Sequence, residues 1–421
     1  MPKIFRQVIR AGELRLEGPG GFVEAFGSAE TGPSVTIRIT DPKVDRRILA
    51  SPELAVAEAY MDGTLQVKSG GADEFLELIY LNIKHYWDTP IYKILGSIAY
   101  HLQRLVYYNP VSRARRNARH HYDTGNAFYR KWLDNDMQYS CAYFPSGDES
   151  LDRAQLAKKR HIAAKLGLKP GLRVLDIGCG WGGMALYLAS VEEVEVLGVT
   201  LSEEQLKIAR ARADALGLSN RVRFELRDYR ELTESFDRIV SVGMLEHVGY
   251  KHLDQYFAQV RERLTADGVA LIHTISTQAD KSFTGPFIRK YIFPGGYIPT
   301  MDETTRSIEK SGLWLLDMEI WRIHYGLTLD HWLKRFMKVR DDVVGMYDER
   351  FARMWEFYLA GCKHSFLRGV NVAIQAQIGK ERDAMPLSRD YIGDVSRRYR
   401  ELEPDFTARI AAATDEAFQA A

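Results

Sequence analysis

An apolar segment that runs into a glycine-rich turn carries the strongest chemical signal in the sequence. Residues 174–183 read VLDIGCGWGG, so Asp176 lies near the end of a predicted strand and Gly178, Gly180 and Gly183 follow it. Glycines in such a turn let the backbone approach a ligand where any Cβ would collide with it. The GxGxxG spacing alone is weak evidence, because nicotinamide-dependent enzymes share it and a purely structural turn is also possible.

The position of the acidic residue separates these interpretations. A dinucleotide site uses an Asp or Glu about 20 residues further on, at the end of the second strand. Here the second predicted strand, VLGVT, ends in Thr200, and the acid lies instead at Asp176. With the later segments, this pattern resembles the class I methyltransferases that use S-adenosylmethionine. The resemblance implies that Gly178 and Gly180 accommodate the methionine part of the cofactor.

The same resemblance assigns further cofactor contacts behind the turn. Thr200 and Gln205, in GVTLSEEQ, stand where this class contacts the ribose side, and Asp228 and Tyr229, in LRDYREL, where it flanks the adenine. Taken singly, these residues are also typical of a strand end, a helix surface or a helix cap. The predicted cofactor-binding residues are Tyr139, Ser140, Asp176, Gly178, Gly180, Thr200, Leu201, Gln205, Asp228 and Tyr229.

Nothing in the sequence favours a nucleic acid as the acceptor of the methyl group. DNA and RNA amino-methyltransferases carry a [DNS]PP[YF] element after the fourth strand, where a flipped base is held. The corresponding segment here, SVGMLEHVG at residues 241–249, has no proline. The net charge is +1, from 57 Lys and Arg against 56 Asp and Glu, so no global field attracts a polyanion.

Nine segments follow one another in a distinctive order along the chain. They are HHYDTGNAFYRKWLD (120–134), MQYSCAYF (137–144), LDRAQLAK (151–158), VLDIGCGWGGMA (174–185), GVTLSEEQ (198–205), GMLEHVG (243–249), LIHTI (271–275), IFPGGYIPT (292–300) and HYGLTLDHWLKRF (324–336). Together these segments resemble the cyclopropane-fatty-acyl-phospholipid synthases and their mycolic-acid relatives. The similarity covers about residues 119–377 closely and the N-terminal part more loosely.

This resemblance implies a reaction and a catalytic group. The enzyme would transfer a methylene group from S-adenosylmethionine to the cis double bond of unsaturated phospholipid acyl chains, through a carbocation that a bound bicarbonate ion deprotonates. By motif, the bicarbonate would be held by Glu246, His273, Tyr325 and Cys141, the last through its backbone amide. Taken alone, Glu246 is typical of a helix cap and His273 of a core histidine. No metal site is expected.

Aromatic side chains could line the pocket for the acyl chain, because their faces stabilise a cation and exclude water. The candidates are Tyr139, Tyr143, Phe144, Phe283, Tyr291, Phe293 and Tyr297. Tyr297 stands where better-known synthases often have a smaller residue, so the product could instead be a methyl-branched or methylene acyl chain. A lipid-binding module without catalysis and a methyltransferase for a soluble small molecule are the remaining alternatives.

The pattern of elements predicts an α/β fold. From about residue 171, apolar strands alternate with helices, which indicates a class I methyltransferase (Rossmann-like) doubly wound sheet. We expect a small N-terminal α+β domain at residues 1–80 for lipid binding or dimerisation, an amphipathic helical linker at 81–118 and a catalytic domain at 119–400.

The environment of the protein is predicted from what the sequence lacks. It has no secretory signal, no apolar stretch of about 18 residues and three widely spaced cysteines, which suits a reducing cytoplasm. The tyrosine-rich linker and the basic run at residues 113–119 would place the enzyme on the inner face of the membrane. A homodimer would grip a phospholipid surface at two points.

Overall fold

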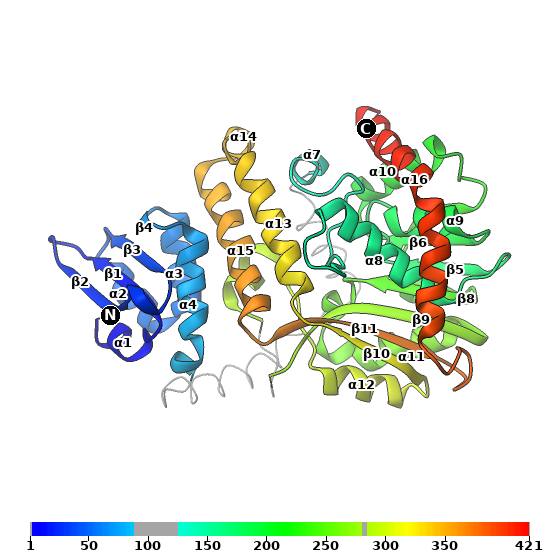
Figure 1. Cartoon of the computed structure of the whole chain (residues 1–421), viewed down its shortest axis with the longest axis horizontal. Helices are drawn as coiled ribbons and strands as arrows, with labels where there is room; N and C mark the ends of the chain where they lie inside the picture. The colour runs from blue at the N-terminus through cyan, green and yellow to red at the C-terminus, as the bar shows by residue number, and fades with distance from the viewer. Residues whose placement is uncertain (1, 88–124, 280–283, 421) are drawn as a thin grey trace. The chain divides into compact units, whose positions relative to one another are not determined.

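The computed structural model describes residues 2–87, 125–279 and 284–420, which form two compact units (Figure 1). Of these residues, 2–87, 284–294 and 326–371 belong to the first unit, and 125–279, 295–325 and 372–420 to the second. Most of the predicted linker, with its basic run, lies outside the described residues. None of the described helices is long and apolar enough to cross a membrane.

The second unit is built on a seven-stranded sheet with the order β10-β11-β9-β8-β5-β6-β7. Neighbours from β9 to β7 run parallel, whereas β10 and β11 pair antiparallel. The strand order reverses beside β5, the first strand of this sheet in the sequence, and ligands bind at such a switch point, beyond the carboxyl ends of the strands. The strands are β5 (Arg173–Ile177), β6 (Glu195–Thr200), β7 (Val222–Leu226), β8 (Phe236–Val242), β9 (Leu264–Thr277), β10 (Trp314–Trp321) and β11 (Asn371–Gly379).

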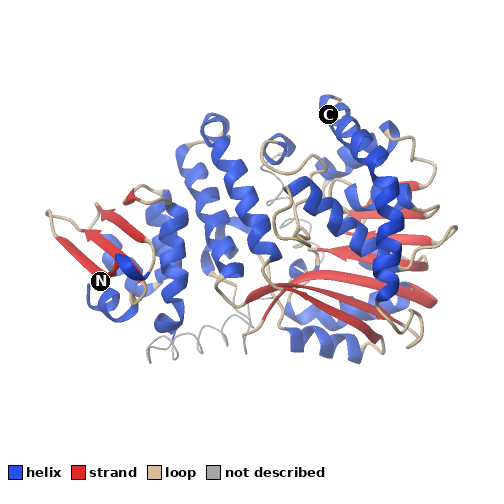
Figure 2. Cartoon of the chain, in the orientation of Figure 1, coloured by secondary structure: helices blue, strands red, loops and turns tan. Residues whose placement is uncertain are grey.

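Helices cover both faces of this sheet, which confirms the predicted doubly wound fold (Figure 2). Successive side chains of a strand point to opposite faces, and Val174 and Leu175 on β5 accordingly enter two different hydrophobic clusters. One face packs against α8 (Leu151–Leu166), α9 (Gly183–Val191), α10 (Glu203–Ala215) and α16 (Asp390–Gln419). The other packs against α11 (Leu253–Arg263) and α12 (Met301–Lys310). The short helices of this unit are α7 (Asn126–Arg130), η2 (Tyr229–Glu231), η3 (Leu245–His247) and η4 (Tyr250–His252).

The first unit contains a four-stranded sheet with the order β2-β1-β3-β4. Its strands are β1 (Gly12–Glu17), β2 (Val23–Ser28), β3 (Ser34–Ile39) and β4 (Leu65–Ser69). Its helical elements are α1 (Pro2–Val8), η1 (Ala29–Thr31), α2 (Lys43–Ala50), α3 (Pro52–Met61), α4 (Ala72–Trp87), η5 (Ile288–Ile292), α14 (Arg340–Met346) and α15 (Glu349–Leu367). Helix α13 (His324–Lys338) begins in the second unit, and its residues from Gly326 onward belong to the first.

Helix α15 ties the late residues of the first unit to the early ones. Lys363 on α15 bonds to Asp73 on α4 at 2.7 Å and to Asp330 on α13 at 2.8 Å, and His364 bonds to Asp73 at 2.8 Å. The structural unit therefore includes residues 326–371, which lie within the range predicted for the catalytic domain. The assignment of separate functions to residues 1–80, 81–118 and 119–400 stays a prediction.

A buried ion-pair network fixes the segment before α8, and its loss should destabilise the second unit. Asp136 bonds to Lys159 on α8 and Arg212 on α10, and all three side chains are buried. We expect Asp136→Ala to lower the free energy of unfolding by about 3–5 kcal/mol, because it leaves two buried cations unpaired. Urea unfolding measures this, with Asp302→Ala, in an exposed pair with Arg306, as the control. Equal losses in the two variants would contradict the expectation.

Candidate active site

The glycine turn lies directly after β5, at the carboxyl end of the sheet. Gly178 and Gly180 have φ angles of +80° and +54°, in the left-handed region that favours glycine. The backbone amides of Gly178 and Cys179 both donate to the carbonyl oxygen of Val199 on β6, at 3.0 Å. A Cβ at Gly180 would have no other atom within 4 Å. The turn is therefore anchored to the sheet on one side and open on the other.

Asp176 supplies an unpartnered acceptor beside this turn. Its side chain is buried at the end of β5, and Oδ2 has no hydrogen-bond partner. Burial raises the pKa of Asp176 to about 7, against the Ala185 backbone amide and the charge of Lys158, which lower it. A buried carboxylate oxygen without a donor costs free energy unless a ligand satisfies it. Asp176 and the open turn fit a cofactor that brings hydroxyl or ammonium groups.

The end of β6 carries the next predicted cofactor residues. Thr200 donates from Oγ1 to Oε1 of Gln205 at 3.2 Å, and both side chains are buried. Ser202 caps α10 by accepting the amide of Gln205, which fixes the start of that helix. Leu201 lies between them, half-buried. The structure thus brings Thr200 and Gln205 together, and their contact with the ribose stays a prediction.

Asp228 and Tyr229 follow β7 and have partners within the chain. The Asp228 carboxylate accepts Nε and Nη2 of Arg230, at 2.8 and 2.7 Å, and also the Arg230 amide, so it caps η2. The ring of Tyr229 meets that of Tyr256 edge to face, with centroids 5.4 Å apart. Arg230 thus already balances the charge of the Asp228 carboxylate. Contact of Asp228 and Tyr229 with the adenine stays a prediction.

A buried lysine, which was not predicted from the sequence to be a site residue, donates hydrogen bonds to side chains of segment 138–141. Lys158 on α8 donates from Nζ to Ser140 Oγ at 2.7 Å and to Gln138 Oε1 at 2.9 Å. Burial lowers the pKa of Lys158 to about 8, against the carboxylates of Asp134 and Asp136, which raise it. Its position at the end of the segment LDRAQLAK was the available signal. Tyr139 packs its ring against Tyr129, with centroids 5.3 Å apart.

Glu246 lies on η3, just after β8, next to the glycine turn. Its Oε1 accepts the backbone amide of Ile275 at 2.6 Å, whereas Oε2 is buried without a partner. Burial raises the pKa of Glu246, against the backbone amides of Ile275 and of Glu246 itself and the Thr274 hydroxyl, which lower it. Met244, two residues earlier, is the neighbour that a Cβ on Gly178 would meet at 3.0 Å. The carboxyl group is thus fixed at one oxygen and available at the other.

His273 and the predicted partners Cys141 and Tyr325 gather around Trp321. Cys141 and Trp321 are buried in one small cluster, and Tyr325 packs against it. The imidazole of His273 meets the indole of Trp321 edge to face, with centroids 4.8 Å apart. Burial, with Lys158 and Lys165 adding to it, lowers the pKa of His273 to about 3, so the ring is neutral at physiological pH.

Polar atoms of this group remain without partners. They are Oε2 of Glu246 and Nε1 of Trp321, both buried. Glu246 is bonded to β9 two residues beyond His273, so the same strand positions both side chains. Buried polar atoms of both kinds, donors and acceptors, fit a small ligand that can donate and accept hydrogen bonds. Trp321 and Gln375 were not predicted from the sequence.

The predicted aromatic lining is divided by the structure. Tyr143 stacks on His161, and Phe144 stacks on His324, with centroids 4.7 and 6.4 Å apart. Tyr297 is buried, donates to Glu303 Oε2 at 2.7 Å and meets Tyr250 edge to face. Tyr291 and Phe293 belong to the first unit, and Phe283 lies outside the described residues. Contact with an acyl chain stays a prediction for all of them.

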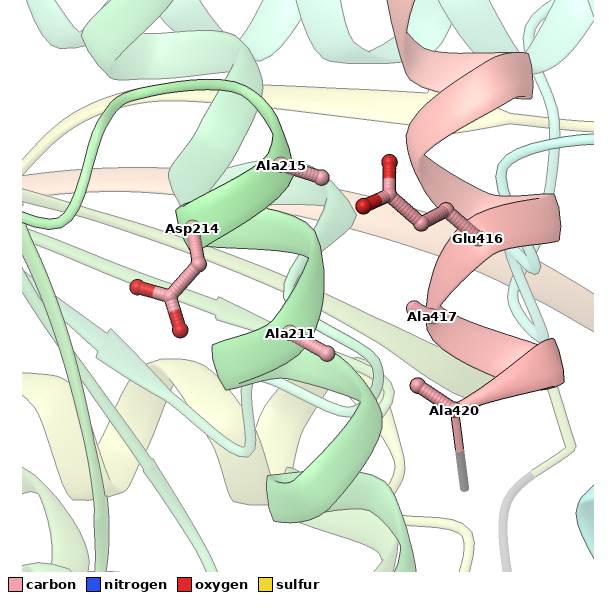
Figure 3. A pocket seen from close by; sticks show the side chains of 6 residues that line it. All are labelled: Ala211, Asp214, Ala215, Glu416, Ala417 and Ala420. Atoms are coloured by element: carbon pink, nitrogen blue, oxygen red, sulfur yellow. The ribbon is translucent and has the colours of Figure 1, made fainter.

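A surface hollow elsewhere in the second unit is lined by none of the predicted site residues. It has a volume of about 350 Å³ and lies between the ends of α10 and α16 (Figure 3). Its lining consists of four alanines and two carboxylates, from Ala211, Asp214, Ala215, Glu416, Ala417 and Ala420.

Comparison with known proteins shows the family to which this chain is similar. Residues 110–376 match the family described as mycolic acid cyclopropane synthetase. The cyclopropane-fatty-acyl-phospholipid synthase of Escherichia coli strain K12 is 40% identical over 343 residues, which are 78% of this chain and 84% of that protein. A probable fatty acid methyltransferase of Pseudomonas putida is 41% identical over 257 residues, 59% of this chain and 65% of that protein. The crystal structure of the mycolic acid cyclopropane synthase CmaA1, complexed with SAH and CTAB, has 30% identity and a TM-score of 0.59, and covers 64% of this chain and 99% of that one.

The strand order, the glycine turn and these similarities define a class I methyltransferase that uses S-adenosylmethionine. Within that class, the chain belongs to the mycolic acid cyclopropane synthetase family. The predicted family, fold and enzyme class are thereby confirmed. The individual site residues are not tested by these similarities and remain predictions.

The raised pKa of Asp176 predicts how cofactor binding depends on pH. With a pKa of about 7, Asp176 is mostly protonated at pH 6 and mostly ionised at pH 8. The ionised form is the better partner for a cationic ligand, so affinity for S-adenosylmethionine should be about 10-fold weaker at pH 6 than at pH 8. Calorimetric titration at both values measures this. Asp176→Asn, which cannot ionise, corrects for titration of the ligand itself, and an equal pH dependence in this variant would contradict the assignment.

Proposed function

We propose that the protein is a cyclopropane-fatty-acyl-phospholipid synthase, which adds a methylene group from S-adenosylmethionine across the cis double bond of an unsaturated phospholipid acyl chain. The observation that carries the proposal is the buried Glu246 carboxyl group with one free oxygen, on the loop that adjoins the cofactor turn. A simple methyl transfer to a good nucleophile needs no such group. Ring closure needs a base, and this loop is where one can be held.

The cofactor residues hold the methyl donor at the carboxyl end of β5. S-Adenosylmethionine supplies an electrophilic methyl group on a sulfonium ion. Asp176 offers the unpartnered oxygen to its polar groups, and the open face of Gly180 leaves room for them. An isolated alkene is a feeble nucleophile, so much of the rate comes from alignment of the double bond with the methyl group in a dry pocket.

Three side chains and one backbone amide would hold the base. Bicarbonate, when bound, accepts the proton that leaves the newly transferred methyl group as the ring closes. Glu246 would accept a hydrogen bond from the ion's own proton at Oε2, and Tyr325 and the neutral His273 would be donors to the ion. The backbone amide of Cys141 is the fourth partner. Rings around this group, among them Tyr143 and Trp321, exclude water and favour the carbocation.

Related chemistry is the second candidate. The similarity to a probable fatty acid methyltransferase of Pseudomonas putida favours an alternative in which the cation is not closed to a ring. Loss of a proton from the acyl chain then gives a methylene chain, whereas a methyl-branched chain forms only if a separate hydride donor reduces the cation. The buried Tyr297, bonded to Glu303, is the residue whose bulk would favour that outcome. Both candidates share the cofactor, the lipid class and the first step.

Mass spectrometry of vesicle lipids distinguishes the candidates. Vesicles of monounsaturated phospholipid are incubated with the protein and S-adenosylmethionine, with and without bicarbonate. A mass gain of one CH₂ group per chain, with loss of the double bond and dependence on bicarbonate, is the result expected for ring formation. The same gain with a double bond retained identifies the methylene alternative, and a gain of CH₄ with loss of the double bond identifies the reduced, methyl-branched one. No gain on any lipid overturns both candidates.

We also propose that the enzyme works as a homodimer at the cytoplasmic surface of the membrane. The basic run at residues 113–119 carries four arginines, which anionic headgroups would attract. The vesicle assay includes this test: product formation should rise with the fraction of anionic lipid and fall with added salt. Activity that changes neither with the fraction of anionic lipid nor with salt would show that the enzyme does not depend on an electrostatic contact with the membrane surface.

A further inference from the structure

Gln375 on β11 is bonded directly to the imidazole of His273 on β9, the neighbouring strand of the sheet. Its side-chain nitrogen Nε2 lies 3.1 Å from Nδ1 of the ring. Both side chains are fully or almost fully buried. The contact joins residues 102 positions apart in the sequence, and Gln375 lies outside the nine segments on which the family resemblance was based.

The direction of this hydrogen bond sets the place of the proton on the imidazole. An amide nitrogen only donates, so Nδ1 must present its lone pair. A neutral imidazole carries one proton, which is then on Nε2. The opposite orientation of the amide would put the NH₂ group where Oε1 now has no donor. Unsatisfied buried N–H groups are rarer than under-satisfied carbonyl oxygens, which favours the orientation described.

The plane of the ring is fixed independently. The indole of Trp321 meets the imidazole edge to face at an interplanar angle of 80°. With the plane held by Trp321 and the tautomer by Gln375, Nε2–H has a defined direction. A histidine in the other tautomer would offer a lone pair at Nε2, and a lone pair repels an oxyanion.

We propose that Gln375 is a positioning residue of the ring-forming reaction, which holds His273 as the Nε2–H tautomer so that it donates a hydrogen bond to bicarbonate. The inference rests on the proposed function, because it presupposes that His273 binds this ion. In this role Gln375 itself contacts neither the cofactor nor the acyl chain. It acts only through the imidazole.

Kinetics of two substitutions test the role. Gln375→Met keeps the volume and removes the amide, and we expect it to raise the KM for bicarbonate about 10-fold or more, with the KM for S-adenosylmethionine unchanged. Gln375→Glu should be worse, because a carboxylate accepts a hydrogen bond from Nδ1–H and so favours the opposite tautomer. The matched control is Gln377→Met, which removes a buried amide two residues along the same strand, bonded to the Lys165 carbonyl and Tyr391. Equal effects at 375 and 377 would overturn the proposal.

The tautomer itself can be observed without activity. Long-range proton–nitrogen spectra of protein labelled at the imidazole nitrogens identify the protonated nitrogen, with His273 assigned by the signal lost in His273→Gln. We expect Nε2–H in the parent protein and Nδ1–H in Gln375→Glu, whereas Nδ1–H in the parent protein overturns the inference. If the parent protein forms product without bicarbonate, the proposed base fails instead, and the spectrum still reports on Gln375.

Discussion

Replacement of Glu246 by Gln should lower the rate of methylene transfer at least about 100-fold and leave the affinity for S-adenosylmethionine within a factor of about two. The reason is the fixed direction of the carboxylate. Oε1 accepts the Ile275 amide at 2.6 Å, so an amide oxygen must take that place. The NH₂ group then replaces Oε2 and opposes the proton of the bicarbonate, with a donor facing a donor.

The measurement is single-turnover product formation at saturating S-adenosylmethionine, across a range of bicarbonate concentrations. Glu403→Gln is the matched control, because Glu403 is also a buried carboxylate of the second unit, bonded to Tyr187 and Arg160. This variant should lose stability and keep its bicarbonate dependence. A Glu246→Gln enzyme with normal turnover would show that the base lies elsewhere, and a variant that no longer binds S-adenosylmethionine would show that Glu246 belongs to the cofactor site.

Local sequence patterns were sufficient to predict the core of the second unit. Strands such as β5 and β9 are apolar on both sides, because helices cover both faces of the sheet, and this makes them visible as continuous apolar runs. The place of residues 326–371 was not visible in the same way. The pairs of Lys363 and His364 with Asp73 join residues about 290 positions apart. The apolar face of α15 predicts that this helix packs against another element, but it does not identify that element.

The same distinction divides the candidate site. Asp176, Glu246 and His273 each lie in a short continuous motif, and these motifs can be read directly from the sequence. Gln375 and Trp321 lie on β11 and β10, and only the strand order β10-β11-β9 brings them to His273. Lone Gln and Trp residues have no spacing rule that marks them, since their roles depend on one hydrogen bond or one ring contact. Residues that orient catalytic groups are therefore harder to predict than the groups themselves.

Gly180→Val should weaken binding of S-adenosylmethionine at least about 100-fold, which corresponds to about 2.7 kcal/mol. The substitution has two separate effects. The substitution strains a backbone with φ +54°, and its side chain projects into the open space on the side of the turn that is not anchored to the sheet. The strain lowers stability, whereas the occupied space acts on the cofactor alone.

Gly171→Val separates the two effects. Gly171 precedes the same strand, β5, at the opposite end from the cofactor turn, and it has φ +82° and equally open space around its Cβ position. Its substitution therefore imposes a similar strain, about 1–2 kcal/mol, without filling the proposed site. Thermal unfolding should show comparable losses in the two variants, and calorimetric titration should show lost affinity only in Gly180→Val. Equal affinities would mean that the turn stabilises the fold and that the methyl donor binds elsewhere, in which case Asp176 would also lose its assigned partner.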